Sequence, residues 1–120
     1  MRNTILFTVS IFSLVSCNTV NIDESIYNKK RKIEVEKMFL QASMKDYEQK
    51  SESEKDKILL KQNGIECDEA LVNAYERASG EPEVKFDKAK PAFIQCWKKY
   101  DAKVISITPT SHELERSIKE

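Results

Sequence analysis

The scarcity of residues that form tight turns is the strongest constraint on the fold of this chain. Only two glycines and three prolines occur among its 120 residues. A β-sandwich or Greek-key domain needs many tight turns, and glycine and proline form most of them. The sequence therefore predicts an all-α fold, a small bundle of three to four helices.

The first sixteen residues are set apart by their low charge. Arg2 is followed by an uncharged apolar run over residues 4–15, and the small residue Ser16 comes next. A helix of about twelve residues spans roughly 18 Å, which is too short for the ~30 Å hydrocarbon core of a bilayer. This pattern is typical of a secretory signal peptide, so we expect residues 1–16 to be cleaved.

The residues around the expected cleavage point carry a resemblance. Leu14-Val15-Ser16-Cys17 resembles the lipobox of bacterial lipoprotein precursors, and the resemblance covers only the first eighteen residues. It implies cleavage before Cys17, a diacylglycerol on its sulfur and an acyl chain on the new amino terminus. Two or three acyl chains give stable anchoring where one is marginal. The alternative is that Cys17 is an ordinary first residue or lies within an uncut helix.

Asn18 extends the same resemblance. An asparagine rather than an aspartate after the lipidated cysteine is similar to the enterobacterial pattern for sorting to the outer membrane. The resemblance therefore implies a protein of the bacterial cell envelope, held at the outer membrane by acyl chains on Cys17 and facing the periplasm.

The charges of the chain are balanced, with 20 basic and 20 acidic side chains. Removal of Arg2 with the leader leaves one acidic charge in excess. Phosphate binding needs a clear excess of Lys and Arg, so no nucleic acid partner is expected. Apolar residues make up 40% and charged residues 33% of the chain, against about 45–50% and ~25% in typical domains. Such a chain can build one modest core and no second domain.

Two cysteines remain once Cys17 is lipidated, namely Cys67 and Cys96. An even pair in an exported, oxidising compartment predicts a structural disulfide. It would close a loop of about thirty residues, which the chain-entropy model values at roughly 3.5 kcal/mol. The alternative is a redox or metal-binding pair, but there is no CxxC, and the only histidine is His112 near the end of the chain. Each cysteine lies on the apolar stripe of an expected helix, so both should face the same interior.

Local signals predict where the helices begin and end. Capping patterns at Asn21 and Ser51 predict two helix starts. The first helix is expected over residues 23–49, and the second is expected to end at Gly64.

The second half of the chain follows the same logic. Asp68 should cap a third helix that ends at Gly80, and residues 84–86 are expected to be extended. A fourth helix opens at Asp87 or at the Lys90-Pro91 step. The expected divisions are a signal peptide at 1–16, a lipidated tether at 17–22, a helical domain at 23–104 and a C-terminal tail at 105–120. In that tail Ile105 to Thr108 is expected to be extended, and Thr110 with Glu113 to cap a last helical turn or to belong to a mobile end.

Sequence patterns that carry chemistry are lacking. There is no GxSxG, no HExxH, no Gly-rich phosphate loop and no dinucleotide fingerprint. Carboxylate pairs such as Glu52 with Glu54 lie in highly charged stretches that solvent should cover, whereas general acid–base catalysis needs a shifted pKa. We therefore expect no enzyme, no catalytic residue, no cofactor and no metal site.

Three surface features allow two interpretations each. The basic cluster at 29–32 could contact anionic headgroups beside the anchor, or be a solvated helix face balanced by Glu34 and Glu36. The charged stretch 45–57 could dock a partner or be a solvated link. An aromatic set could be a recognition patch, although its helical spacing favours a place in the core. That set comprises Tyr75, Phe93, Trp97 and Tyr100.

Two function classes fit these features, both with an unidentified envelope protein as partner. The first is a protein-binding lipoprotein of the inhibitory, immunity or exclusion type. The alternative is a structural or assembly subunit of an envelope machine. An exposed aromatic anchor on the third and fourth helices would favour the first class. An apolar stripe on the first helix, with a charged surface elsewhere, would favour the second. The sequence does not determine the oligomeric state.

Overall fold

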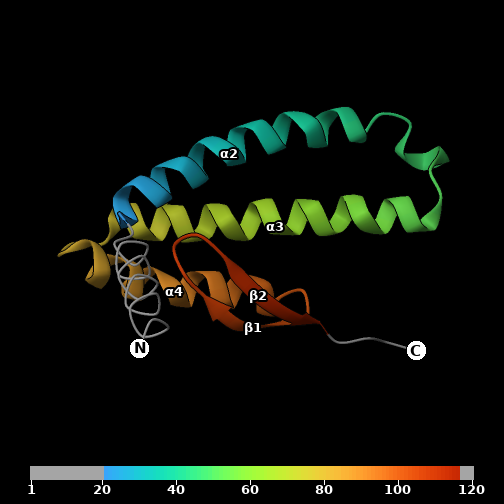
Figure 1. Cartoon of the computed structure of the whole chain (residues 1–120). Coiled ribbons are helices and arrows are strands. Elements are labelled where there is room, and N and C mark those ends of the chain that lie inside the picture. Colours follow the sequence, from blue (N-terminus) through green and yellow to red (C-terminus); the bar gives the residue numbers. More distant parts are fainter. Residues whose placement is uncertain (1–20, 117–120) are drawn as a thin grey trace, which may run out of the picture.

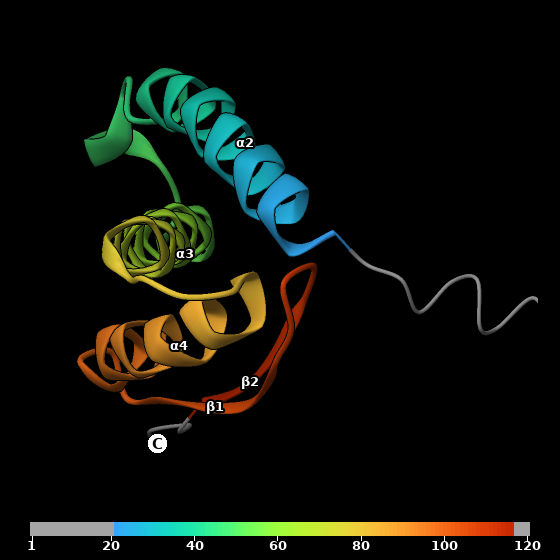
Figure 2. The same ribbon diagram turned by 90° about the vertical axis from the view of Figure 1, so that its left-hand side faces the viewer.

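The computed structural model describes residues 21–116 of the chain, and Figure 1 shows their arrangement. Within these residues, three α-helices are followed by a two-stranded antiparallel hairpin. In the end-on view of Figure 2, α3 lies between α2 and α4. The fold is thus mostly helical as expected, but the hairpin corrects the expectation of an all-α chain. The elements are α2 (Ile22–Ser43), a 3-10 turn (Tyr47–Gln49), α3 (Glu52–Arg77), α4 (Pro82–Lys98), β1 (Ala102–Ile107) and β2 (His112–Arg116).

The expected cap opens α2. The side chain of Asn21 accepts a hydrogen bond from the backbone N–H of Glu24 at 3.0 Å, which satisfies one of the free donors of the first turn. The helix ends at Ser43, earlier than the expected residue 49. Asp46 takes a φ of 58°, a left-handed conformation through which an α-helix does not continue.

One continuous helix, α3, replaces the two helices expected between residues 51 and 79. The capping box at Ser51 and Glu54 is present as expected. The expected end at Gly64 is wrong, because this residue lies in the middle of α3. A methyl group at Gly64 would lie 3.9 Å from Cζ2 of Trp97. Buried residues on both sides of the glycine, including Ile58, Ile65 and Leu71, outweigh its helix cost of about 1 kcal/mol.

The connection between α3 and α4 is shorter than expected. Gly80 takes a φ of +118°, which suits a residue without a Cβ atom. Pro82 then occupies the first turn of α4, where its missing N–H costs nothing. Residues 84–86 are helical, not extended, because Phe86 is buried in the core. The expected start at Asp87 or Lys90 is therefore too late.

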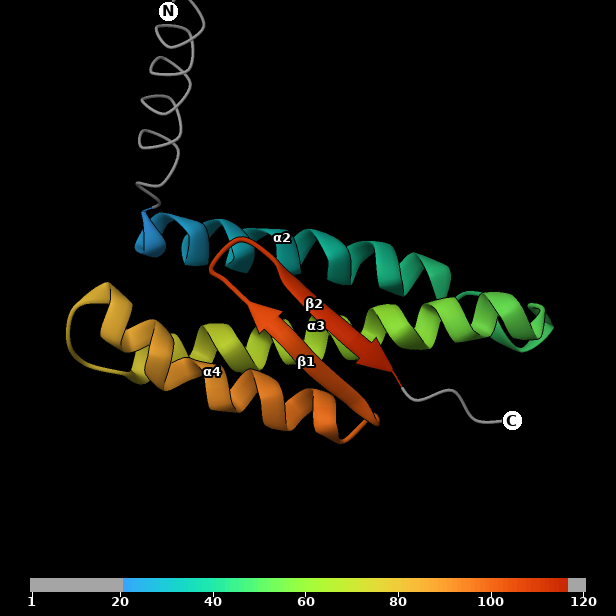
Figure 3. The same cartoon turned by 60° about the horizontal axis from the view of Figure 1, so that its bottom comes forward.

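The C-terminal segment forms a hairpin that the sequence analysis did not anticipate. Val104 pairs with Leu114 and Ile107 with His112 across the two strands. At the turn, the backbone N–H of Thr108 donates to the carbonyl of Ser111 at 2.7 Å. The extended segment expected at 105–108 is confirmed over residues 105–107, which belong to β1. The helical turn expected at residues 110–113 is wrong, because residues 112 and 113 belong to β2. Figure 3 shows the hairpin lying across α3 and α4.

The disulfide predicted from the sequence joins α3 to α4. Cys67 and Cys96 are paired, with their Cα atoms 5.3 Å apart, and both are buried. The ring of His112 packs edge-on against Phe93, with ring centres 5.0 Å apart, so the hairpin closes one side of the core. The core residues beside the two cysteines are Ile26, Ile33, Ile65, Leu71, Val72, Tyr75, Phe86, Ala89, Phe93, Trp97 and Ala102.

None of the helices within residues 21–116 is both long enough and apolar enough to cross a bilayer. The expected signal peptide at 1–16 and the lipidation site Cys17 lie outside the described residues.

Candidate functional site

Helix α2 has two apolar faces, and only one of them is used by the fold. Ile26 and Ile33 are 3% and 2% exposed and belong to the core. Val35 follows Ile33 by two residues, which turns its side chain by about 200° around the helix axis. The apolar residues of α2 are therefore divided between the core and the opposite face of the helix.

The outward face of α2 carries large apolar side chains in contact with solvent. Met38 and Phe39 are 69% and 67% exposed, Tyr27 is 60% exposed and Val35 is 49% exposed. Four such side chains on one helix face are unusual for a surface that remains in water. We call this set, Tyr27, Val35, Met38 and Phe39, the outer face of α2.

Ion pairs to α3 fix the rotation of α2 about its axis. Lys30 pairs with Glu76 at 2.9 Å, and Lys37 pairs with Glu69. The hydroxyl of Tyr75 donates to the carboxylate of Asp23, which holds the first turn of α2 against α3. Each exposed pair contributes less than about 1 kcal/mol. Together with the buried isoleucines, they keep the outer face of α2 pointing away from the core.

The basic cluster at 29–32 is used largely within the fold. Lys29 lies 3.8 Å from Asp68 and Lys30 lies 2.9 Å from Glu76, both on α3. The expected balance by Glu34 and Glu36 is not the arrangement found, since these carboxylates pair with Lys37 and Lys61. Contact of the cluster with headgroups stays a prediction. The charged stretch 45–57 forms the link between α2 and α3 and the first turns of α3, and most of it is exposed.

The aromatic set belongs to the core, as its spacing predicted. Tyr75, Phe93 and Trp97 are each no more than 3% exposed. Tyr100 is partly buried and its hydroxyl donates to Glu66, which also accepts from Lys99 at 2.7 Å. The apolar side chains that remain exposed on α4 are Val84 and Ile94. Within residues 21–116, then, α3 and α4 present no exposed aromatic anchor.

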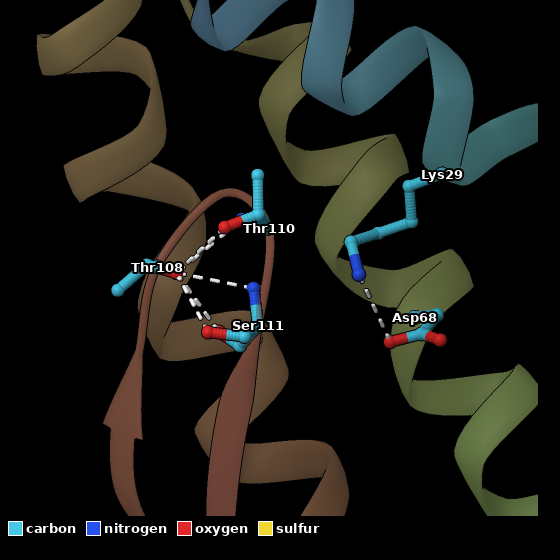
Figure 4. A network of polar contacts seen from close by, with 5 residues as sticks. All are labelled: Lys29, Asp68, Thr108, Thr110 and Ser111. Atoms are coloured by element: carbon cyan, nitrogen blue, oxygen red, sulfur yellow. Dashed lines mark hydrogen bonds and ion pairs between the residues drawn. The ribbon is translucent and has the colours of Figure 1, made fainter. Parts of the chain in front are cut away.

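A groove runs between α2 and the hairpin, with α3 as its floor. Its wider part has a volume of about 330 Å³ and is bordered by Lys32 of α2, Leu60 of α3 and Leu114 of β2, among others. A second hollow of about 200 Å³ continues it toward the hairpin turn and shares Lys32. Figure 4 shows the ion pair of Lys29 with Asp68 beside this turn.

Two titratable groups at the groove are shifted by burial. Loss of solvent raises the pKa of Asp68 against the opposing effect of Lys29. Loss of solvent also lowers the pKa of His112, which favours the neutral imidazole, while nearby Asp68 acts in the opposite direction. These two residues, from α3 and β2, are brought together only by the fold.

Among residues 21–116 there is no group of three or more histidine, cysteine, aspartate or glutamate side chains placed to hold a metal ion. Comparisons with protein-family models, with curated proteins and with solved structures find no match to this chain.

Sequence reasoning missed both the outer face of α2 and the groove. The outer face of α2 could have been found from the helical periodicity of the sequence. Val35, Met38 and Phe39 fall on the side of the helix opposite to Ile26 and Ile33. No sequence pattern could have indicated the groove, because its lining residues come from α2, α3, α4 and β2. The hairpin itself was not expected.

Proposed function

We propose that this protein is a protein-binding subunit of the bacterial cell envelope, anchored by acyl chains on Cys17. The observation that carries the proposal is the outer face of α2, where Met38 and Phe39 are 69% and 67% exposed. Burying two such side chains against a partner would contribute on the order of 1.5–3 kcal/mol each. An amphipathic helix with an unused apolar face is a common way to dock onto another protein.

The position of α2 supports an assembly role over an inhibitory one. Its apolar outer face lies on the first helix, while the aromatic residues of α3 and α4 are in the core. An inhibitor of the immunity or exclusion type remains the alternative, and it would also use a rigid helical surface. The two classes differ in the number of partners and in their dependence on the anchor.

Crosslinked capture from native envelopes tests the proposal. A photoreactive residue placed at Met38 should crosslink to an envelope protein, whereas the same residue at exposed Lys98 should not. With the photoreactive residue moved to Val35, Met38→Asp with Phe39→Asp should abolish capture without lowering the melting temperature, since both side chains are exposed. Equal capture from both positions, or capture that survives the double substitution, would contradict binding through the outer face.

A comparison of the lipidated chain with a Cys17→Ser form separates the two classes. Several envelope subunits recovered only with the lipidated chain would support an assembly role. One stoichiometric toxin, hydrolase or receptor recovered with both forms would support the inhibitory alternative. A mature mass equal to that of unmodified residues 17–120 would rule out the acyl anchor.

A further inference from the structure

The groove between α2 and the hairpin has an apolar part that the fold leaves open. Leu60 is 39% exposed and borders the groove together with Ile65 and Leu114. Trp97 also borders this part of the groove. This part can accept an apolar side chain of moderate size, because its volume of about 330 Å³ falls within the usual range for binding clefts.

Strand β2 borders this groove and has a free edge. The sheet has two strands, and β2 lies on the α2 side of β1 in Figure 3. Among the described residues, β2 pairs with β1 and with no other strand. A strand edge offers unpaired backbone N–H and C=O groups, which an extended chain can use by adding a further strand.

The hollow at the hairpin turn favours an acidic occupant, because its charged lining residues are Lys29 and Lys32, whereas the wider part of the groove also carries Glu36 and Asp68. Lys32 borders both hollows and is exposed. Unlike Lys29 and Lys30, it forms no ion pair with any residue of the described range. Ser25 and Thr110 add hydroxyl groups near it. A carboxylate placed there would find a positive charge and hydrogen-bond donors together.

Two buried polar atoms beside the groove form no hydrogen bond, although one of them, Oδ1 of Asp68, lies 3.8 Å from Nζ of Lys29. The indole Nε1 of Trp97 and Oδ1 of Asp68 have no hydrogen-bond partner among the described residues. An unpaired buried polar group costs about 1–3 kcal/mol. Both atoms are closed off from solvent in the structure, so neither is counted among the contacts that an occupant of the groove would make.

We propose that this groove binds an extended peptide segment of a partner protein, which adds to the free edge of β2 and places an acidic side chain at Lys32 and an apolar side chain against Leu60, Ile65 and Leu114. The inference rests on the proposed protein-binding function only in that the partner is a protein. It uses a surface distinct from the outer face of α2, so each surface can fail its test independently.

Trp97 gives a direct probe of occupancy, because it is the only tryptophan in the chain. The full chain, purified in detergent with its disulfide intact, is used to select from a displayed library of random twelve-residue peptides. The most enriched sequence is then synthesised and titrated against Trp97 fluorescence. We expect enriched peptides to pair acidic with apolar residues, to lack proline, and to slow amide exchange at residues 112–116 when bound.

Matched substitutions locate the binding site. Leu60→Asp should weaken peptide binding at least tenfold, whereas Leu59→Asp should change it less than twofold. The two leucines are neighbours and both exposed, but only Leu60 borders the groove. Lys32→Glu should also weaken binding at least tenfold, with Lys45→Glu as the control. Each variant is first compared with the wild type by melting temperature, so that loss of fold is distinguished from loss of binding.

Four outcomes would overturn the inference. These are the absence of any enriched peptide, equal effects of Leu60→Asp and Leu59→Asp, peptides that bind as helices, and a Trp97 signal that changes with protein concentration alone. The last would place a second copy of the chain in the groove. None of these outcomes tests the outer face of α2. A peptide that binds in the groove should still bind to Met38→Asp, because Met38 does not line the groove.

Discussion

Asp68 shows how one buried side chain couples the stability of this small core to pH. It lies on α3 with its side chain only 17% exposed, and it is near Lys29, Lys32 and Glu36 of α2 and His112 of β2. Burial is the largest influence and raises its pKa above the ordinary value of 3.8. The folded protein therefore binds this proton more tightly than the unfolded chain does. The stability that follows is present below about pH 4 and is lost as the pH rises through the folded pKa.

Replacement of Asp68 tests this linkage. Asp68→Asn removes the cost of a buried charge, so we expect a higher melting temperature than wild type at pH 7. The difference should shrink as the pH falls through the raised pKa of the wild-type carboxyl, because protonation removes the buried charge. Glu113→Gln, on an exposed side chain of β2, serves as the control and should have little effect. Thermal melts across this pH range give the answer; a lower melting temperature at pH 7 would mean that the attraction of Lys29 outweighs burial.

For the helices, some signals in the sequence were sufficient to predict where each one begins. The caps at Asn21 and Ser51 were predicted, because a cap depends on residues three positions apart. The end at Gly64 was wrong, because packing of α3 against α2 and α4 decides that position and no local pattern records it. The early start of α4 has the same cause, namely burial of Phe86. Local chemistry thus predicts helix starts better than it predicts whether a helix is interrupted.

Two glycines give opposite predictions that follow from this difference. Gly64→Ala should raise stability by roughly 0.5–1 kcal/mol, because the helix interior favours alanine and the added methyl would make ordinary contact with Trp97 at 3.9 Å. Gly80→Ala should lower it, because the φ of +118° does not suit a side chain and the methyl would lie 3.2 Å from Val84. Urea unfolding of both variants decides the matter. A loss of stability in Gly64→Ala would indicate that α3 is interrupted there after all.

At the scale of the whole molecule, the Cys67–Cys96 disulfide supplies a large share of the stability. It closes a loop with a sequence separation of 29, which corresponds to about 3.5 kcal/mol in the chain-entropy model. Cys67→Ser with Cys96→Ser should lower the melting temperature by roughly 15–25 °C. Reduction of the wild type should reproduce this loss, and reductant should not affect the double variant. Equal melting curves for the oxidised wild type and the double variant would contradict a stabilising bridge.

Features that depend on one helix could be predicted from the sequence, whereas the surfaces formed by several elements could not. The pairing of Cys67 with Cys96 was readable, since each lies on the apolar stripe of its helix. The core role of Phe93 and Trp97 was readable for the same reason. The hairpin was not, because Val104 to Ile107 alternates weakly and the turn at Thr108–Ser111 lacks glycine. Without the hairpin there is no groove, so no inspection of single segments could have found it.

The order in which the elements touch bears on how quickly the chain folds. The main contacts join neighbours in the sequence, namely α2 with α3, α3 with α4, α4 with β1, and β1 with β2. Chains with such local contacts fold fast, because little loop-closure entropy precedes each favourable contact. The two cysteines would be brought together by the collapse of one helical hairpin. Oxidation would then join two cysteines that the pairing of α3 with α4 has already brought close together. The disulfide would therefore stabilise the native arrangement of these helices and would not be needed to find it.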